Sequence, residues 1–388
     1  MLIIFESVFF ASLFIIFWAM IGYPFSLKIL NRVFKPKNPP KNYTYYPTVT
    51  LMIVAHNEEK VIFDKLKNIV TLNYPKDKIK YLVASDNSTD RTNEIVKSFI
   101  KNHPSEPIEL FEVKERKGKT NAQNEAQKTI HTEFIVMTDA NSILDSESVR
   151  ELMASFTSED ISYVTGKLEI VNSKSNEVSK SENTYWEKDL EIREIESAFQ
   201  TITAGNGALY ACRNKDYVDF DPIKSHDSSM PIHYALLGKR AIANHDAIAY
   251  EKAGEVIEDE FNRKVRMNRV LLDHILPSLK ILNPIKYRWF SYFYFGHRTC
   301  RYLLWIAHLG VYISNALLIN ESLIYSLLFI SQNTFYVLAL VKLAFNIDNK
   351  LITLIYYYCA TLLAQWMGIS NVISGKSKPF WEKAESTR

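Results

Sequence analysis

The chain is poor in cysteine and in net charge. Only three of its 388 residues are cysteines, and no CxxC pair occurs among them. This excludes a disulfide scaffold and a thiolate zinc site, and it fits a reducing compartment. The 46 Lys and Arg residues nearly balance the 43 Asp and Glu residues, giving a formal charge of +3. Without a local basic patch, this charge gives no reason to expect a nucleic-acid partner.

The first apolar run has no basic residue in front of it. Residues 8–29 contain no charge before Lys28, whereas several basic residues follow. A cleaved signal peptide would begin with positive charge, and about 20 apolar residues are enough to span a bilayer. We therefore expect a transmembrane anchor over residues 1–30. Because basic flanks stay in the cytoplasm, the next segment should be cytosolic.

The carboxyl-terminal third is apolar again. Residues 301–375 contain three stretches, 302–320, 323–345 and 351–372, that predict transmembrane helices. Residues 283–300 interleave aromatic and basic side chains, which predicts an interfacial helix. A buried helix of a soluble domain is the alternative there.

The tail over residues 376–388 raises a problem of topology. Three full crossings after a cytosolic domain would place it outside, yet it carries four basic residues, which prefer the inside. Either one stretch does not cross, or the positive-inside rule is broken. We expect a multi-pass protein of the plasma (inner) membrane with a cytosolic catalytic domain.

The middle of the chain, residues 31–282, alternates short β-branched runs with longer amphipathic segments. This pattern predicts an α/β domain with a mostly parallel sheet. The expected strands are 48–55, 80–85, 108–113 and 134–138, and the helices that follow them are 58–72, 91–100, 119–130 and 146–156.

Polar residues follow all four strands, where such sheets bind ligands. Singly, each could be a helix cap, a solvated residue or a turn former. Together they suit a nucleoside diphosphate. Asp86 can accept from a base or ribose, and Lys119 beside Gly118 offers positive charge. Asp139 with Asn141 forms a sparse oxygen site for Mg²⁺ or Mn²⁺.

These motifs resemble the membrane-bound family 2 glycosyltransferases, which have a GT-A fold and include synthases of poly-N-acetylglucosamine, hyaluronan and cellulose. The resemblance rests on residues 48–59, 83–92, 118–119 and 137–141. It implies that Ala55, Asn57, Glu58 and Asp86 line the nucleotide and that Asp139 is the metal-binding first Asp of a DxD motif. Asn141 replaces the last Asp of that motif.

The resemblance continues toward the acceptor side. The glycine-rich segment 203–213 resembles the floor of the acceptor site, which implies acceptor binding by Gly205, Asn206 and Gly207. A tight sheet turn is the alternative reading of these glycines. Asp227 corresponds to the catalytic base, because a carboxylate can take the proton of an attacking hydroxyl. It could instead cap a helix, and His226 stands where the family has an acidic residue.

A basic segment, residues 260–267, occupies the place of the QxxRW motif of processive synthases. Arg263 and Arg266 could hold a diphosphate as forks of donors, or they could form a solvated helix face. Arg263 replaces the Gln of the motif and Met267 replaces its Trp. This departure argues against processive polymerisation.

The resemblance therefore implies an inverting membrane glycosyltransferase for cell-surface polysaccharide synthesis. Its donor would be a nucleotide sugar, a UDP-sugar by preference, and its acceptor a lipid-linked or growing glycan. A processive synthase that secretes its polymer and a catalytically inactive membrane scaffold are the open alternatives. A solute transporter is disfavoured, because the apolar stretches lack paired carboxylates.

Overall fold

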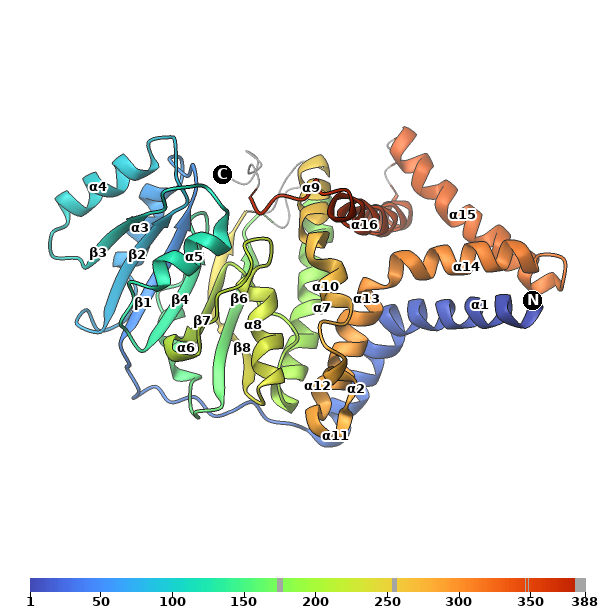
Figure 1. Ribbon diagram of the computed structural model, residues 1–388, viewed down its shortest axis with the longest axis horizontal. Helices are drawn as coiled ribbons and strands as arrows, with labels where there is room; N and C mark the ends of the chain where they lie inside the picture. The colour runs from blue at the N-terminus through green and yellow to red at the C-terminus, as the bar shows by residue number, and fades with distance from the viewer. Residues whose placement is uncertain (173–176, 253–256, 346, 348, 381–388) are drawn as a thin grey trace. The chain divides into compact units, whose positions relative to one another are not determined.

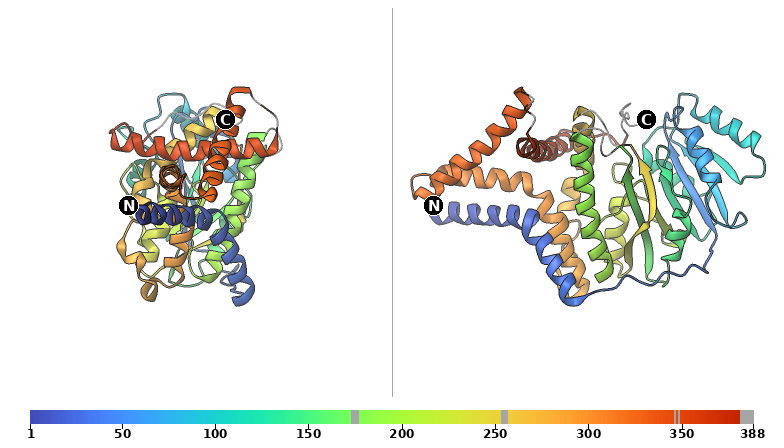
Figure 2. Two further views of the ribbon diagram at one scale, coloured as in Figure 1. Left: turned by 90° about the vertical axis from the view of Figure 1, so that its right-hand side faces the viewer. Right: turned by 180° about the vertical axis from the view of Figure 1, so that it is seen from behind.

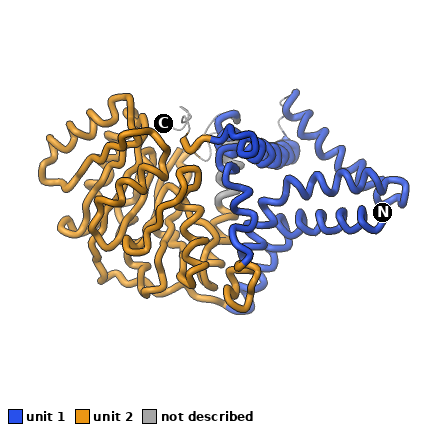
Figure 3. The backbone as a smooth tube through the Cα atoms, viewed as in Figure 1, with its two compact units in different colours: residues 1–34, 257–279, 292–377 blue, residues 35–256, 280–291, 378–388 orange. Residues whose placement is uncertain are grey.

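The structure, a computed structural model, describes residues 1–172, 177–252, 257–345, 347 and 349–380. Its chain forms two compact units (Figure 3). The α/β unit consists of residues 35–256, 280–291 and 378–388, and the helical unit of residues 1–34, 257–279 and 292–377. The domain boundaries expected at residues 30, 282 and 300 stay predictions. Of the expected tail, residues 381–388 lie outside the described residues.

One mixed sheet organises the described part of the α/β unit (Figure 1). Its strand order is β3-β2-β1-β4-β7-β6-β8-β5. Strands β3, β2, β1 and β4 run parallel, β7 is antiparallel to β4 and β6, and β6 is parallel to β8. The strands are β1 Val49–Ala55, β2 Ile79–Ser85, β3 Ile108–Glu112, β4 Phe134–Asp139, β5 Ile143–Leu144, β6 Ile161–Ile170, β7 Leu209–Arg213 and β8 Arg240–Glu251.

Helices cover both faces of this sheet, which explains why β1 is buried along its whole length. On one face pack α3 (Ile62–Val70), α4 (Thr92–Asn102) and α6 (Ser148–Ala154). On the other pack α5 (Lys119–Gln127) and α8 (His226–Leu236). The long helix α7 (Glu177–Phe199) completes the unit. The four predicted strands and the helices after them are confirmed, although α3 begins later than expected.

The connections of the sheet fix where a ligand can bind. From β1 the chain moves outward through α3 to β2 and through α4 to β3, then returns through α5 to β4 on the other side of β1. Such a reversal opens a crevice at the carboxyl ends of the strands, here between β1 and β4. The polar residues that follow these strands therefore gather at one edge of the sheet.

Within its described residues, the helical unit contains three helical stretches long and apolar enough to cross a membrane. They are Leu2–Phe34, Leu323–Phe345 and Lys350–Ile373. The first comprises α1 (Leu2–Phe17), a π-turn and α2 (Tyr23–Phe34), and the others are α15 and α16. Helix α14 (Leu304–Leu318) is also apolar, but its 15 residues rise only about 22 Å. It is therefore shorter than the hydrocarbon core of a bilayer.

Close backbone packing holds α1 and α14 side by side (Figures 1 and 2). A side chain at Gly310 would meet the Ser12 hydroxyl at 2.3 Å, so only glycine fits there. The remaining helices are short: α9 (Ile257–Met267), α10 (Leu271–Ile275), α11 (Pro284–Tyr287), α12 (Trp289–Phe293) and α13 (Cys300–Tyr302). Several aromatic residues of the expected interfacial helix, such as Phe290 and Phe293, are fully buried.

Candidate active site

Four residues from separate elements meet at the carboxyl end of β4. Lys119 begins α5, Asp139 ends β4, Gly207 precedes β7, and Asp227 lies in the first turn of α8. The Lys119 ammonium donates to Asp139 Oδ1 at 2.5 Å and to the Gly207 carbonyl at 3.3 Å. A Cβ on Gly207 would lie 3.5 Å from Lys119 Nζ and 3.6 Å from the Asp227 carboxyl carbon. The fold thus brings together three of the sequence-predicted charged residues.

Opposite charges surround this lysine. Burial alone would lower the pKa of Lys119, but Asp139, Asp227 and Glu251 outweigh it and raise that pKa above its ordinary value. The ammonium therefore stays protonated at neutral pH. Asp139 and Asp227 therefore leave negative charge beside Lys119 that suits a metal ion accompanying a diphosphate.

Asp86 anchors the loop that leads into α5. Its carboxylate is buried and accepts the N–H groups of Lys117 and Gly118 at 3.1 and 2.9 Å. Its own N–H donates to the carbonyl of Ala55 at 2.9 Å. Gly118 has a φ of +97°, which suits glycine alone. Asp86 thus holds the backbone directly before Lys119 in place. Its position in the sequence did not indicate this role.

The loops after β1 and β2 are tied to each other. Asn57 has a φ of +52°, a conformation that asparagine tolerates, and its side-chain oxygen accepts the N–H of Thr89 at 2.8 Å. The N–H of Glu58 donates to the Thr92 hydroxyl at 2.7 Å, and Glu58 is fully buried. These contacts make Glu58 part of the framework of the nucleotide side.

The glycine-rich segment is a tight loop in which Gly205 is closely packed and Gly207 has space beside it. A Cβ on Gly205 would lie 1.8 Å from the Tyr163 hydroxyl, so this glycine is required by packing. The Asn206 side chain turns back to accept the N–H of Ala208 at 2.9 Å. Gly207, by contrast, faces Lys119 and Asp227. The loop leaves Gly207 as the member that faces the charged cluster.

A buried ion pair supports the glycine-rich loop. Arg193 pairs with Asp189 at 2.6 Å and donates to the Gly205 carbonyl at 2.8 Å. The Gly205 N–H in turn donates to the backbone carbonyl of Asp227 at 2.8 Å. These bonds connect the loop to the start of α8 and so fix the position of Gly207 relative to Asp227.

His226, next to Asp227, is a buried neutral link. Its two ring nitrogens lie 2.9 Å from Gln123 Oε1 and 2.8 Å from the Tyr217 hydroxyl. Burial, together with the charge of Lys119, lowers the pKa of His226 to about 3. Where the resembled family has an acid, this chain therefore places an uncharged group that connects α5 and α8.

Beneath Asp139 lies a polar group that the sequence reasoning missed. Lys65 of α3 is fully buried, and its ammonium donates to Thr138 Oγ1 at 2.9 Å and to the Ser142 carbonyl at 2.5 Å. The Ser142 hydroxyl is hydrogen-bonded to Glu251 at the end of β8. Burial lowers the pKa of Lys65 to about 7 and raises that of Glu251 to about 7. Lys65 lies on the buried stripe of α3, a signal that was available.

The residues present fit a divalent ion that arrives with a diphosphate. Among the described residues, no three His, Cys, Asp or Glu side chains gather closely enough to hold a metal alone. Asp139 is partly exposed, with 28% of its side-chain surface accessible, and Asn141 follows it on the same turn. One carboxylate and one amide oxygen suit Mg²⁺ or Mn²⁺ when phosphate oxygens and water complete the octahedron.

The two predicted arginines lie on α9, in the helical unit. The Arg263 guanidinium forms a forked ion pair with Glu260, at 2.7 Å from Nε and 2.9 Å from Nη2. A role for Arg263 and Arg266 in diphosphate binding stays a prediction.

The end of the described chain contacts the Asp86-anchored loop. A Cβ on Gly118 would lie 2.4 Å from the Pro379 carbonyl oxygen. The Arg116 guanidinium lies 4.6 Å from the centre of the Phe380 ring. Lys378, Pro379 and Phe380 thus belong to the α/β unit, a placement that sequence periodicity could not indicate.

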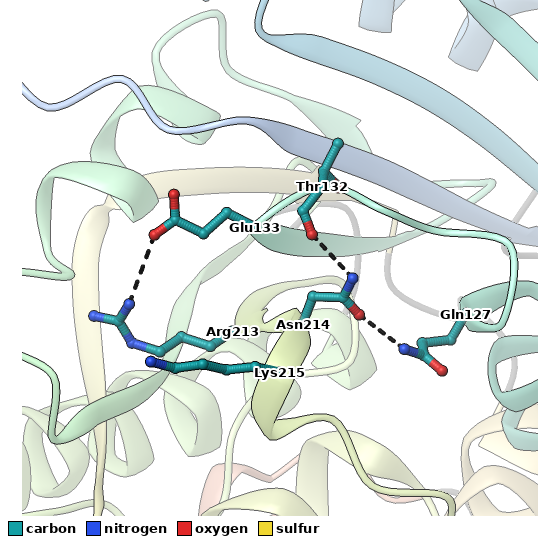
Figure 4. A pocket seen from close by; sticks show the side chains of 6 residues that line it. All are labelled: Gln127, Thr132, Glu133, Arg213, Asn214 and Lys215. Carbon is teal, nitrogen blue, oxygen red and sulfur yellow. Dashed lines mark hydrogen bonds and ion pairs between the residues drawn. The ribbon is translucent and has the colours of Figure 1, made fainter.

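A pocket also lies at the opposite edge of the sheet. Its lining residues come from the segment before β4 and the end of β7 (Figure 4). They are Gln127, Thr132, Glu133, Arg213, Asn214 and Lys215. None is a predicted site residue, and the pocket is away from the carboxyl ends of the parallel strands.

The mixed sheet and its helices define a fold of the GT-A class. The model of Glycosyl transferase family 2 matches residues 50–218. The chain is 31% identical over 175 residues to the probable glycosyltransferase YdaM of Bacillus subtilis, a match that covers 43% of this chain and 41% of that protein. It is 30% identical over 128 residues to poly-beta-1,6-N-acetyl-D-glucosamine synthase of Staphylococcus epidermidis, covering 33% of this chain and 30% of that one.

A solved structure extends the likeness in fold. It is the mannosyltransferase PcManGT from Pyrobaculum calidifontis in complex with GDP-Man and Mn²⁺. The TM-score is 0.73 at 20% identity, covering 96% of this chain and 99% of that one. Residues 50–218 are thus a family 2 glycosyltransferase domain, as the motifs predicted. The sequence matches span less than half the length of both curated relatives.

Proposed function

We propose that this protein is an integral-membrane glycosyltransferase that transfers a sugar from a nucleotide sugar to a lipid-linked or growing glycan acceptor. The observation that carries the proposal is the meeting of Lys119, Asp139 and Asp227 around Gly207. In this arrangement Lys119 supplies a cation, Asp139 an oxygen ligand for a metal ion, and Asp227 a candidate base. The named relatives, which include a glucosamine-polymer synthase, agree with this chemistry.

The proposed reaction assigns one task to each residue. Asp227 takes the proton of the acceptor hydroxyl as its oxygen attacks the anomeric carbon. The bond from that carbon to the nucleoside diphosphate breaks, and Lys119 stabilises the charge that develops on the leaving phosphates. Asp139 and Asn141 would hold Mg²⁺ or Mn²⁺, which neutralises the diphosphate when bound. Attack opposite the leaving group inverts the anomeric centre.

The contact of Pro379 with Gly118 bears on the membrane topology. It lies within the α/β unit, so the described tail is on the same side of the membrane as that unit. An even number of crossings must then separate residue 256 from residue 378. Helices α15 and α16, which are long and apolar enough to cross a membrane, would supply two. The basic tail and the α/β unit would both lie in the cytosol at the plasma (inner) membrane.

The test is turnover of a donor panel by the full chain purified in detergent. UDP-sugars are the expected donors, and GDP-mannose belongs in the panel because PcManGT was solved with it. Each is supplied with Mn²⁺ or Mg²⁺ and lipid extract, and nucleoside diphosphate release and product mass are measured. Metal-dependent release that EDTA abolishes is expected. A long polymer would indicate a processive synthase, and no release from any donor would favour the inactive scaffold.

A further inference from the structure

Helix α3 makes hydrogen bonds on either side of the turn over residues 139–141, which carries the proposed metal ligands Asp139 and Asn141. Lys65 reaches both ends of the turn, because it donates to Thr138, directly before Asp139, and to Ser142, directly after Asn141. One helical turn further along α3, Asn68 makes a two-way bond with Leu144. Its amide donates to the Leu144 carbonyl at 2.8 Å, and its oxygen accepts the Leu144 N–H at 2.8 Å.

A second element holds the turn from the other side. The Ser142 hydroxyl is hydrogen-bonded to Glu251 of β8, and the Ser142 N–H donates to the Asp139 carbonyl at 3.3 Å. The segment from Thr138 to Leu144 thus has contacts to α3 and β8 at its ends. The Asp139 carboxylate, which points into the cluster toward Lys119, is the part that remains partly exposed.

Core stability does not explain a lysine at this position. Its neighbours on the buried stripe of α3 are Ile62, Leu66 and Ile69, all with 0% exposure, and Lys65 itself has 0% exposure. Burying an ammonium costs several kcal/mol before its bonds compensate, and apolar residues of similar size are often as stabilising in such places. An apolar side chain would complete the stripe, but it could not bond Thr138 and Ser142.

We propose that Lys65 is a positioning residue that sets the Asp139–Asn141 turn in the geometry required by the divalent ion of the donor complex. The inference rests on the proposed function. Groups that orient metal ligands through hydrogen bonds commonly contribute 10–100-fold to metal affinity. Lys65 acts by geometry, since its positive charge by itself opposes the arrival of a second cation.

Lys65→Met tests this in the full-length protein, with Lys67→Met as the matched control. Lys67 is an exposed lysine two residues away on the same helix. The affinity for Mn²⁺ is measured by EPR titration of free Mn²⁺, with saturating UDP or GDP present. The expected result is a 10–100-fold weaker Mn²⁺ affinity in Lys65→Met and an unchanged affinity in the control.

Turnover supplies a second readout. Excess Mn²⁺ should restore most of the wild-type rate of Lys65→Met, because the defect lies in metal affinity. Unchanged or tighter Mn²⁺ binding in this variant would overturn the inference, since it would mean that Lys65 acts only through its charge or through packing. If Lys65→Met does not fold, Asn68→Ala decides the matter: it should also weaken Mn²⁺ binding, and an unchanged affinity would be contradictory.

The two proposals fail in different ways. A wild-type protein that binds no Mn²⁺ with either nucleotide would contradict the proposed function itself. A wild-type protein that binds Mn²⁺ and turns over a donor, beside a Lys65→Met variant of equal affinity, would refute only the role of Lys65.

Discussion

The antiparallel pair β4 and β7 carries an ion pair at each of its ends. At the amino end of β4, Arg213 Nη1 lies 3.9 Å from Glu133. At the carboxyl end, Lys119 Nζ lies 2.5 Å from Asp139. Both ends are polar and both border a possible site, so composition alone does not distinguish them.

Their surroundings do. Arg213 donates to the carbonyls of Ile161 and Ser158 at 2.9 and 3.0 Å and lies over the Phe134 ring, so its guanidinium is committed to the fold. Lys119 instead faces a cluster in which the carboxylates outnumber it. Such an arrangement is poorly compensated until further positive charge arrives, as in sites that bind a metal with its substrate. This difference supports the proposal that the functional site lies at the carboxyl end of β4.

The largest effect should come from the candidate base. Asp227→Asn keeps the shape of the side chain but cannot accept the acceptor proton, so turnover should fall about 10²–10⁴-fold. Asp219→Asn, an exposed aspartate of the same region, is the matched control and should match the wild type. The measurement is nucleoside diphosphate release at saturating donor. A fall of less than about tenfold would remove Asp227 from the role of base.

Two glycines of one loop should respond in opposite ways. Gly205→Ala places a methyl group against the buried Tyr163 ring and should cost about 1–3 kcal/mol of unfolding free energy. Gly207→Ala makes only ordinary contacts and should fold normally, but it narrows the space beside Lys119 and Asp227. We expect it to lower kcat/KM by roughly tenfold or more. Thermal unfolding and donor kinetics of the two variants separate the effects, and equal melting temperatures would contradict this assignment.

Acidic pH should reduce the stabilisation that the buried neutral His226 side chain gives to the fold. Because its pKa is about 3 in the folded protein and about 6.5 when unfolded, the unfolded state binds more protons below pH 6.5. Stability is fully present above that pH and falls below it, by about 2 kcal/mol at pH 5. The loss is measured as the difference in unfolding free energy between the wild type and His226→Gln from pH 7.5 to 5, because Glu251, whose pKa is raised to about 7, changes stability in the opposite direction over that range. An identical pH dependence in the variant would mean that other groups cause the loss.

Much of the nucleotide side could be predicted because its signals are local. Buried parallel strands are β-branched runs, and the residues directly after them, such as Asp86 and Asp139, gather at one edge by topology. The roles of these residues are less local. Asp86 was expected to face the nucleotide, yet its carboxylate accepts two backbone N–H groups, which no sequence pattern specifies.

The missed features depend on long-range packing. A single lysine in a helix is usually solvated, so only its position on the apolar stripe of α3 distinguishes Lys65. The contact of Pro379 with Gly118 joins two ends of the chain that share no periodicity. The bounds of α14 also differ from those of the apolar run 302–320, because the helical path continues backward through Leu303 into α13.

The central claim is that the Asp139 end of β4 binds the donor and the Glu133 end does not. It is tested most directly by metal-dependent donor turnover in Asp139→Asn beside Glu133→Gln, two variants that neutralise one carboxylate at either end of the same strand. The account predicts that Asp139→Asn loses at least the 10–100-fold expected for an altered metal shell, while Glu133→Gln keeps the wild-type rate. Equal rates in the two variants, or a loss confined to Glu133→Gln, would contradict it.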